Sequence, residues 1–291
     1  MKRKLEVIRS PYTGYCFGVK RAMRLIEEGL KEHGRKIYTI GDVIHNPQAV
    51  ERLKSRGVKP VSSLSEIEPG ATLIIRAHGV HPDLMLEARK RRIQFIDTTC
   101  PFVQRSQKYA RQLSDESYQV IIIGDSHHPE VQSISGHARE NAIIINTVEE
   151  AEKLDRIEKV GIVIQTTFSH DKAMMIIETL GKKTDDIRVF DTICQATVLR
   201  REATLKLAES VDLMLVVGGR GSSNTRRLFQ MCVDAGIPAK FIEAAEEIED
   251  TWFNGCRMVG LTTGTSTPDW IIEKVLERME EISSLHETKD D

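Results

Sequence analysis

The segments Ile93-Gln94-Phe95-Ile96-Asp97-Thr98-Thr99-Cys100 and Ile187-Arg188-Val189-Phe190-Asp191-Thr192-Ile193-Cys194 repeat one pattern almost residue for residue. Each has the apolar residues of a strand, followed by a short polar turn that ends in a cysteine. A helical pattern begins directly after the second cysteine, and its apolar positions are Leu199, Ala203, Leu207 and Val211. These segments predict a strand, a turn and a helix that begins at the cysteine, and a chain built by repeating this junction.

A third cysteine, Cys16, opens a similar helix. Its apolar stripe consists of Val19, Ala22, Met23, Ile26 and Leu30. A cysteine at a helix N-terminus lies near the positive end of the backbone dipole, which lowers its pKa and favours the thiolate that binds soft metals. We therefore interpret Cys16, Cys100 and Cys194 as ligands of one shared metal centre. The common alternative for any single cysteine is burial as a small apolar residue, and we interpret Cys232 and Cys256 in this way.

The composition describes a globular protein with no overall basic field. The chain has 291 residues, of which 40% are apolar, and a formal net charge of -2. This charge disfavours nucleic-acid binding, and the sequence lacks both a membrane span and a signal-peptide core. We therefore expect a cytoplasmic protein. In a reducing cytosol its five cysteines suggest metal or redox chemistry more than a disulfide framework.

Strands that end in glycine and a polar loop follow the three cysteine helices. The loops begin at Gly41, Gly124 and Gly218, and further strands follow at 73–75, 160–164 and 258–261. This alternation predicts three small α/β domains with mainly parallel sheets, at 1–99, 100–193 and 194–291. Because ligands bind at the carboxyl ends of such strands, we expect the domains to lie around a pseudo-threefold axis with a central cluster cavity. The charged segment 277–291 is expected to be a frayed helix end or disordered.

Three thiolates from separate domains fit a 4Fe-4S cluster in which one iron has no protein ligand. A zinc site of three cysteines and a histidine is the competing interpretation. The sequence contains no C-x-x-C pair, which disfavours the commonest zinc and ferredoxin motifs. Residue spacing alone leaves both centres open.

The predicted loops carry a set of mostly uncharged hydrogen-bond donors. These are His45, His78, His128, Ser222, Ser223, Asn224 and Ser266. Together with helix N-termini they are suited to bind a diphosphate. For a single histidine, a structural role in a turn is the better interpretation, but three histidines in matching loops favour a binding role.

Glu130 follows His128 closely, in His128-Pro129-Glu130-Val131. A carboxyl group that faces a shielded cavity can hold a proton near neutral pH, so Glu130 is a candidate proton donor. Thr166 and Thr167 are candidates for relaying that proton. The alternative is that Glu130 only stabilises the helix dipole and that both threonines are ordinary strand-end residues.

Eight motifs occur in this sequence in the order found in one known family. They are Gly14-Tyr15-Cys16-Phe17-Gly18-Val19, His45-Asn46-Pro47, Arg76-Ala77-His78-Gly79, Asp97-Thr98-Thr99-Cys100-Pro101, His128-Pro129-Glu130-Val131, Gln165-Thr166-Thr167, Ser222-Ser223-Asn224 and Gly264-Thr265-Ser266-Thr267-Pro268. The set resembles the 4-hydroxy-3-methylbut-2-enyl diphosphate reductases along almost the whole chain. These iron-sulfur enzymes complete the methylerythritol phosphate route to isoprenoid precursors.

The resemblance implies a 4Fe-4S cluster bound by Cys16, Cys100 and Cys194, with the substrate hydroxyl at the open iron. It implies that the seven donors above hold the diphosphate and that Glu130 donates protons with the help of Thr166. The implied reaction adds two electrons and two protons, expels water and yields isopentenyl and dimethylallyl diphosphate. The sequence departs from the family after Thr197, where the family commonly has Asn, Arg and Gln and this chain has Leu199, Arg200 and Arg201. It departs again at Thr263 and Thr265, where the family usually has alanine.

Basic residues are concentrated in the early turns of the three cysteine helices. They are Lys20, Arg21, Arg24, Arg105, Lys108, Arg111, Arg200 and Arg201. Cations near a helix N-terminus are mildly unfavourable, which suggests another purpose. We expect a docking surface for an acidic electron carrier such as reduced ferredoxin or flavodoxin, with a merely solvated face as the alternative.

Two further functions compete with the reductase. A redox-sensing iron-sulfur or zinc module would explain the cysteines, but not the Ser-Ser-Asn loop, the histidines or Glu130. A dehydratase with an open cluster iron would need no external electrons, so the dependence on a reductant separates the two enzymes.

Overall fold

The computed structural model describes residues 5–33, 36–139 and 141–288 and contains three four-stranded sheets, each with only parallel pairing among these residues. The chain forms two compact units. The first unit consists of Met1–Val19, Ile44–Arg52 and Gln195–Asp291, and the second of Lys20–Val43 and Leu53–Cys194. The predicted α/β class with parallel sheets is confirmed. The domain limits at 99 and 193, the pseudo-threefold axis and the central cavity stay predictions.

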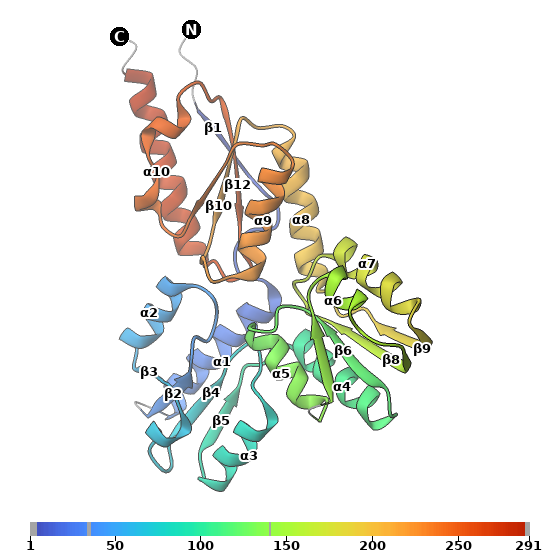
Figure 1. Cartoon of the computed structure of the whole chain (residues 1–291). Helices are drawn as coiled ribbons and strands as arrows, with labels where there is room; N and C mark the ends of the chain where they lie inside the picture. Colours follow the sequence, from blue (N-terminus) through green and yellow to red (C-terminus); the bar gives the residue numbers. More distant parts are fainter. Residues whose placement is uncertain (1–4, 34–35, 140, 289–291) are drawn as a thin grey trace. The chain divides into compact units, whose positions relative to one another are not determined.

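The first unit contains one sheet with helices on both faces (Figure 1). Its strands, in spatial order, are β1 (Glu6–Arg9), β12 (Met258–Thr263), β10 (Leu213–Val217) and β11 (Ala239–Ile242). Alternate residues of β10 point to opposite faces, so Leu215 packs in the core with α10 (Asp269–Thr288), while Met214 and Val216 pack toward α8 (Gln195–Ala208) and α9 (Ser223–Asp234). Two short 3-10 helices, η2 (Ala245–Glu247) and η3 (Asp250–Phe253), follow β11.

The expectation that segment 277–291 is frayed or disordered is wrong for its described part. Helix α10 continues to Thr288. Met279 and Ile282 are fully buried in the core that also contains Leu5, and the Ser283 hydroxyl donates to the Leu5 carbonyl at 3.3 Å. Two apolar residues three positions apart are enough to anchor the last turns, although the charges around them obscure the pattern. Residues 289–291 lie outside the described residues.

The second unit contains the other two sheets. One has the order β3 (Val58–Val61), β2 (Ile37–Ile40), β4 (Thr72–Ile75) and β5 (Gln94–Asp97), and α3 (Pro82–Lys90) and η1 (Leu64–Glu66) contribute to its core. The other has the order β7 (Ala142–Ile145), β6 (Gln119–Ile123), β8 (Ile157–Ile164) and β9 (Thr184–Phe190). Helices α4 (Pro101–Asp115) and α5 (Pro129–His137) share one core with β6, and α7 (His170–Gly181) packs beside α6 (Val148–Glu152) and β9. The central strands are almost entirely apolar because parallel sheets are covered on both faces.

Each cysteine helix connects an edge strand of one sheet to a central strand of another. Cys100 lies between β5 and α4, which leads to β6, and Cys194 lies between β9 and α8, which leads to β10. Cys16 lies between β1 and α1 (Phe17–His33), which leads to β2, with α2 (Pro47–Ser55) following. The predicted strand, turn and helix junctions are confirmed. No helix within the described part of the chain is long and apolar enough to cross a membrane.

Candidate functional site

The three cysteines at helix starts have one backbone geometry in common. Each follows an edge strand and donates its N–H to a carbonyl two residues beyond the end of the adjacent strand. The bonds are Cys16 to Thr265 at 3.0 Å, Cys100 to Ala77 at 3.0 Å and Cys194 to Thr166 at 2.8 Å. The fold therefore fixes each of these cysteines at the carboxyl edge of its own sheet, where ligands of α/β proteins bind.

The side-chain environments separate these cysteines from the other two. Cys16, Cys100 and Cys194 are half-buried and form no disulfide. Cys232 is fully buried, which raises its pKa to about 11, and burial also raises the pKa of Cys256. The first three thus fit a thiolate-ligated group, whereas Cys232 and Cys256 do not. Cys16 belongs to the first unit and the other two to the second, and the described residues contain no preassembled group of three His, Cys, Asp or Glu side chains, so joint ligation stays a prediction.

Three of the predicted diphosphate-binding loops meet in the first unit. The Ser266 hydroxyl donates to the His45 carbonyl at 3.1 Å. A Cβ atom on Gly219 would collide with the same carbonyl, so only glycine permits this close approach of the loop before Ser222. Ser222 caps α9, because its hydroxyl accepts from the N–H of Thr225 at 3.3 Å. His45, Ser222 and Ser266 are therefore brought to one place, with a helix N-terminus beside them.

Asn224 is a buried amide whose polar atoms lack hydrogen bonds among the described residues. It lies in the first turn of α9 and is 2% exposed, and neither Oδ1 nor Nδ2 has a partner there. Leaving buried polar atoms unpaired costs about 1–3 kcal/mol, so such a group indicates a ligand that completes it. An anion at the start of α9 would receive a hydrogen bond from Nδ2 and from free backbone N–H groups.

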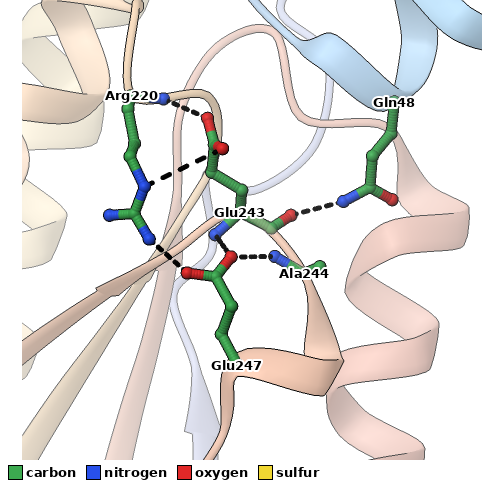
Figure 2. A network of polar contacts seen from close by, with 5 residues as sticks. All are labelled: Gln48, Arg220, Glu243, Ala244 and Glu247. Carbon is green, nitrogen blue, oxygen red and sulfur yellow. Dashed lines mark hydrogen bonds and ion pairs between the residues drawn. The ribbon is translucent and has the colours of Figure 1, made fainter.

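A second network of polar contacts joins the loop before Ser222 to the segment after β11 and to Gln48 of α2 (Figure 2). Glu243 accepts from the backbone N–H of Arg220 at 2.5 Å, and its own carbonyl accepts from the Gln48 amide at 2.7 Å. The Arg220 guanidinium forms ion pairs with Glu247 and, at 3.8 Å, with Glu243. The Arg220 guanidinium is thus already paired with two carboxylates, and it fixes the loop before Ser222. We therefore do not assign Arg220 to the anion site.

The remaining predicted residues meet in the second unit, around α5. The rings of His78 and His128 lie edge to face with centroids 5.5 Å apart. His128 caps α5, and its Nδ1 accepts from the backbone N–H of Glu130 at 3.2 Å. This bond places the proton of a neutral His128 on Nε2, so that Nε2 is the donor of the ring.

Glu130 is buried and is held by Thr166. Its carboxylate accepts from the Thr166 N–H at 2.6 Å and from the Thr166 hydroxyl at 2.8 Å. Burial disfavours the charged form and raises the pKa of Glu130 to about 7, although both hydrogen bonds oppose the shift. Glu130 also stands in the first turn of α5, as the helix-dipole alternative requires. A carboxyl with a pKa near neutrality can nevertheless both hold and release a proton at neutral pH.

The neighbouring Thr167 has a different contact. Its hydroxyl accepts from the Gln165 amide at 3.2 Å, and the Gln165 carbonyl oxygen accepts from the Asp125 N–H at 3.0 Å. Gln165 is fully buried and thus positions the loop after β6. The structure therefore connects Thr166 to Glu130, whereas the Thr167 hydroxyl contacts Gln165.

Arg200 does not belong to an exposed docking surface, and that part of the expectation is wrong. It is 3% exposed and donates hydrogen bonds to backbone and side-chain oxygens inside the first unit. The fully buried side of α8 is formed by Thr197, Arg200, Thr204 and Ala208. The predicted apolar stripe of Leu199, Ala203, Leu207 and Val211 is only half-buried. A search for apolar periodicity misses this face because hydrogen bonds allow its polar residues to be buried.

The chain as a whole is similar to several known proteins. The LytB protein family matches residues 7–280. The chain is 42% identical to a 4-hydroxy-3-methylbut-2-enyl diphosphate reductase of Geobacter metallireducens, over 96% of this chain and 99% of that one. A protein of the same name from Aquifex aeolicus is 42% identical, with 96% and 97% covered.

Two solved structures are also similar. One is a structure of (E)-4-hydroxy-3-methyl-but-2-enyl diphosphate reductase, described as the terminal enzyme of the non-mevalonate pathway. It is 42% identical, covers 95% of this chain and 99% of its own, and has a TM-score of 0.71. The other is the E-1-hydroxy-2-methyl-but-2-enyl-4-diphosphate reductase of Plasmodium falciparum, which is 30% identical with a TM-score of 0.89 and covers 95% of this chain and 88% of its own.

Proposed function

The chain belongs to the LytB protein family, and from this premise we propose that it is a reductase of 4-hydroxy-3-methylbut-2-enyl diphosphate. The reaction takes up two electrons and two protons, releases the hydroxyl group as water and gives isopentenyl and dimethylallyl diphosphate. The observation that carries the proposal is the Glu130 carboxyl, which is buried, bonded to Thr166 and has a pKa of about 7. Loss of a hydroxyl group as water requires such an acid.

The chain's own residues divide the work between binding and proton transfer. We assign the diphosphate to His45, His78, His128, Ser222, Ser223, Asn224 and Ser266. Their hydrogen bonds orient the allylic chain, so that its hydroxyl group lies within reach of Glu130. Thr166 holds the Glu130 carboxyl in place through two hydrogen bonds and supplies a hydroxyl through which the proton can be replaced.

Cys16, Cys100 and Cys194 would hold a 4Fe-4S cluster. The three partly exposed thiols at helix starts fit such a group, and the bound cluster supplies electrons and a Lewis-acidic iron. Anaerobically purified protein should contain about four irons and four sulfides per chain. Zinc in place of iron would overturn this assignment.

The reaction itself is tested by stoichiometry. With the substrate and a limiting chemical reductant, one product molecule should form for every two electrons consumed. Conversion without any reductant would instead indicate a dehydratase. A cluster that cycles between redox states but leaves the substrate unchanged would indicate a sensing module.

Asn224→Leu should move ligand binding and stability in opposite directions. The substitution removes two buried polar atoms that have no described partner and keeps a similar volume. We therefore expect the ligand-free protein to become slightly more stable to heat, while inorganic pyrophosphate binds at least about tenfold more weakly, the equivalent of one charge-assisted hydrogen bond. Leu228→Ala, a core change on the same helix, is the control that should lower stability without a specific loss of pyrophosphate affinity. Unchanged affinity in Asn224→Leu would remove Asn224 from the anion site.

We further propose that exposed basic residues of α1 and α4 dock an acidic electron carrier. Lys20, Arg24, Arg105, Lys108 and Arg111 are exposed, and all belong to the second unit. Arg105 and Lys108 lie five and eight residues after Cys100, within about 12 Å along the helix axis at 1.5 Å per residue. Arg21 is committed elsewhere, because it donates to the Thr99 carbonyl at 3.1 Å.

Charge reversal tests the docking proposal. Arg105→Glu with Lys108→Glu should slow reduction by ferredoxin or flavodoxin severalfold at low salt, and added salt should reduce the difference. The same double charge change at Lys153 and Lys172, which are exposed around α6 and α7, is the control and should have little effect. Turnover with a small chemical reductant should stay unchanged in both proteins. Equal rates with the protein donor at low salt would contradict the docking surface.

A further inference from the structure

Arg200 is a buried cation that joins two loops of the first unit. Its Nη1 donates to the Thr263 carbonyl at 2.7 Å, the Thr263 hydroxyl at 3.0 Å and the Gly264 carbonyl at 2.8 Å. Its Nη2 donates to the Gly14 carbonyl at 2.8 Å. One guanidinium group thus connects the end of β12 with the loop that carries Cys16.

The same two loops also form hydrogen bonds directly with each other. The Gly14 N–H donates to the Thr263 hydroxyl at 3.0 Å, and the Cys16 N–H donates to the Thr265 carbonyl at 3.0 Å. Gly14 has a φ of +78°, which glycine adopts without strain. Because Ser266 follows Thr265 directly, the position of Arg200 bears on both a proposed cluster ligand and a proposed diphosphate ligand.

Arg200 has no carboxylate within ion-pair distance among the described residues. Its hydrogen-bond partners among these residues are carbonyl and hydroxyl oxygens, and its Nε has none. Burial lowers the pKa of Arg200 to about 10, and the interaction with nearby Cys16 opposes this shift. The side chain therefore remains charged at neutral pH. A buried charge is costly unless something compensates it, and neutral donors would hold the loops as well.

A related bond occurs in the second unit. Arg21, in the first turns of the helix that follows Cys16, donates to the carbonyl of Thr99, which immediately precedes Cys100. Arg200 stands six residues after Cys194 and bonds to the residue two before Cys16. In both cases an arginine from one cysteine helix holds the backbone just before another cysteine.

We propose that Arg200 is a positioning residue for Cys16. Arg200 locks the loop that carries Cys16 to the end of β12, and it supplies a fixed positive charge toward an anionic cluster. The proposal rests on the proposed cluster-binding function. It gives Thr263 a role as well, because the Thr263 hydroxyl is an acceptor for both Arg200 and Gly14.

The locking part is tested in the metal-free protein by amide hydrogen exchange. Arg200→Gln should exchange at least tenfold faster than the parent protein in the segments around Gly14 and Thr265, while the sheet of β6 and β8 keeps its protection. Thr204→Val is the matched control. It removes the 2.8 Å hydroxyl contact between Thr204 and Thr262 one turn farther along α8, without changing a charge. Equal exchange of both loops in Arg200→Gln and the parent protein would overturn the proposal.

The charge part is tested by the reduction potential of the reconstituted cluster. Removing a nearby positive charge disfavours the reduced state, so Arg200→Gln should shift the potential to more negative values. Arg200→Lys keeps the charge but loses the forked geometry, and it should restore most of the potential while leaving the loops less protected than in the parent protein. Thr204→Val should leave the potential unchanged. A potential in Arg200→Gln equal to that of the parent protein would contradict the charge part.

These measurements separate this inference from the proposed function. If the parent protein takes up no iron and sulfide, the proposed function fails and the charge part fails with it. Selective loss of protection in Arg200→Gln would still support the locking part, since exchange is measured without metal. If the parent protein binds the cluster and Arg200→Gln keeps both protection and potential, only the inference about Arg200 fails.

Discussion

Cys16→Ser, Cys100→Ser and Cys194→Ser are each expected to abolish stable binding of iron and sulfide, and reductive turnover with it. Each cysteine is half-buried at the start of a helix and has its N–H bonded beyond the end of the adjacent strand. Serine preserves the volume and the backbone bond, but its hydroxyl is a poor substitute for a thiolate as a ligand of iron. The loss should therefore be chemical, with the fold retained.

Cys232→Ser and Cys256→Ser are the matched controls. Cys232 lies in the core between β10, α8 and α9, so its serine variant should lose stability because a hydroxyl is buried there. Both variants should nevertheless retain the cluster. Iron and sulfide analysis, an absorption spectrum and a melting curve on all five variants check the prediction. Full cluster content in Cys100→Ser, or selective cluster loss in Cys256→Ser, would contradict the ligand assignment.

The repeated junctions made most of the architecture predictable. A strand that leads into Asp-Thr and then a cysteine, followed by helical periodicity, has few other interpretations, and β5 with α4 and β9 with α8 form as expected. Long-range strand pairing is different, because parallel strands leave no local trace of their partners. The pairing of β1 with β12, which brings Glu6 next to Met258, could be established only from the structure.

The candidate site residues could be predicted because they lie in polar loops that follow the strands. Motifs identified Glu130 and Asn224 as candidates, but neither the bonds from Thr166 nor the unpaired Asn224 amide can be derived from residue order. For Arg200 the sequence led to a wrong prediction. Because Arg200 is next to Arg201, the sequence suggests that it belongs to a charged surface. Nothing in the sequence reveals that it donates to the carbonyl groups of Gly14 and Gly264.

Glu130→Gln should stabilise the ligand-free protein, and more so at pH 8 than at pH 5. The pKa of Glu130 is about 7 in the folded protein, against an ordinary value of 4.5. Between these values the native state keeps a proton that the unfolded chain has lost, so the contribution of Glu130 to stability falls as the pH rises. Above about pH 7 the free energy of unfolding has lost the full contribution that the raised pKa of Glu130 removes. At about 1.4 kcal/mol per pKa unit this loss is on the order of 3 kcal/mol. Melting or denaturant curves across this range measure the difference between the two proteins.

The same substitution should abolish most of the turnover. Glutamine can accept from the Thr166 N–H and donate to the Thr166 hydroxyl, so both contacts of the carboxylate have a replacement. The cluster and the affinity for the substrate should therefore change little. The amide cannot release a proton at neutral pH, and loss of a general acid typically slows the chemical step by about 100-fold to 10,000-fold.

Single-turnover product formation in pre-reduced Glu130→Gln protein measures that step directly. Thr166→Val is the companion variant, because it removes the hydroxyl bond to Glu130 but keeps the backbone N–H bond, and its defect should be the smaller of the two. If Glu130 served only the dipole of α5, Glu130→Gln would keep its rate and Thr166→Val would be equally unaffected. A rate close to that of the parent protein, with cluster and affinity intact, would therefore remove Glu130 from the proton path.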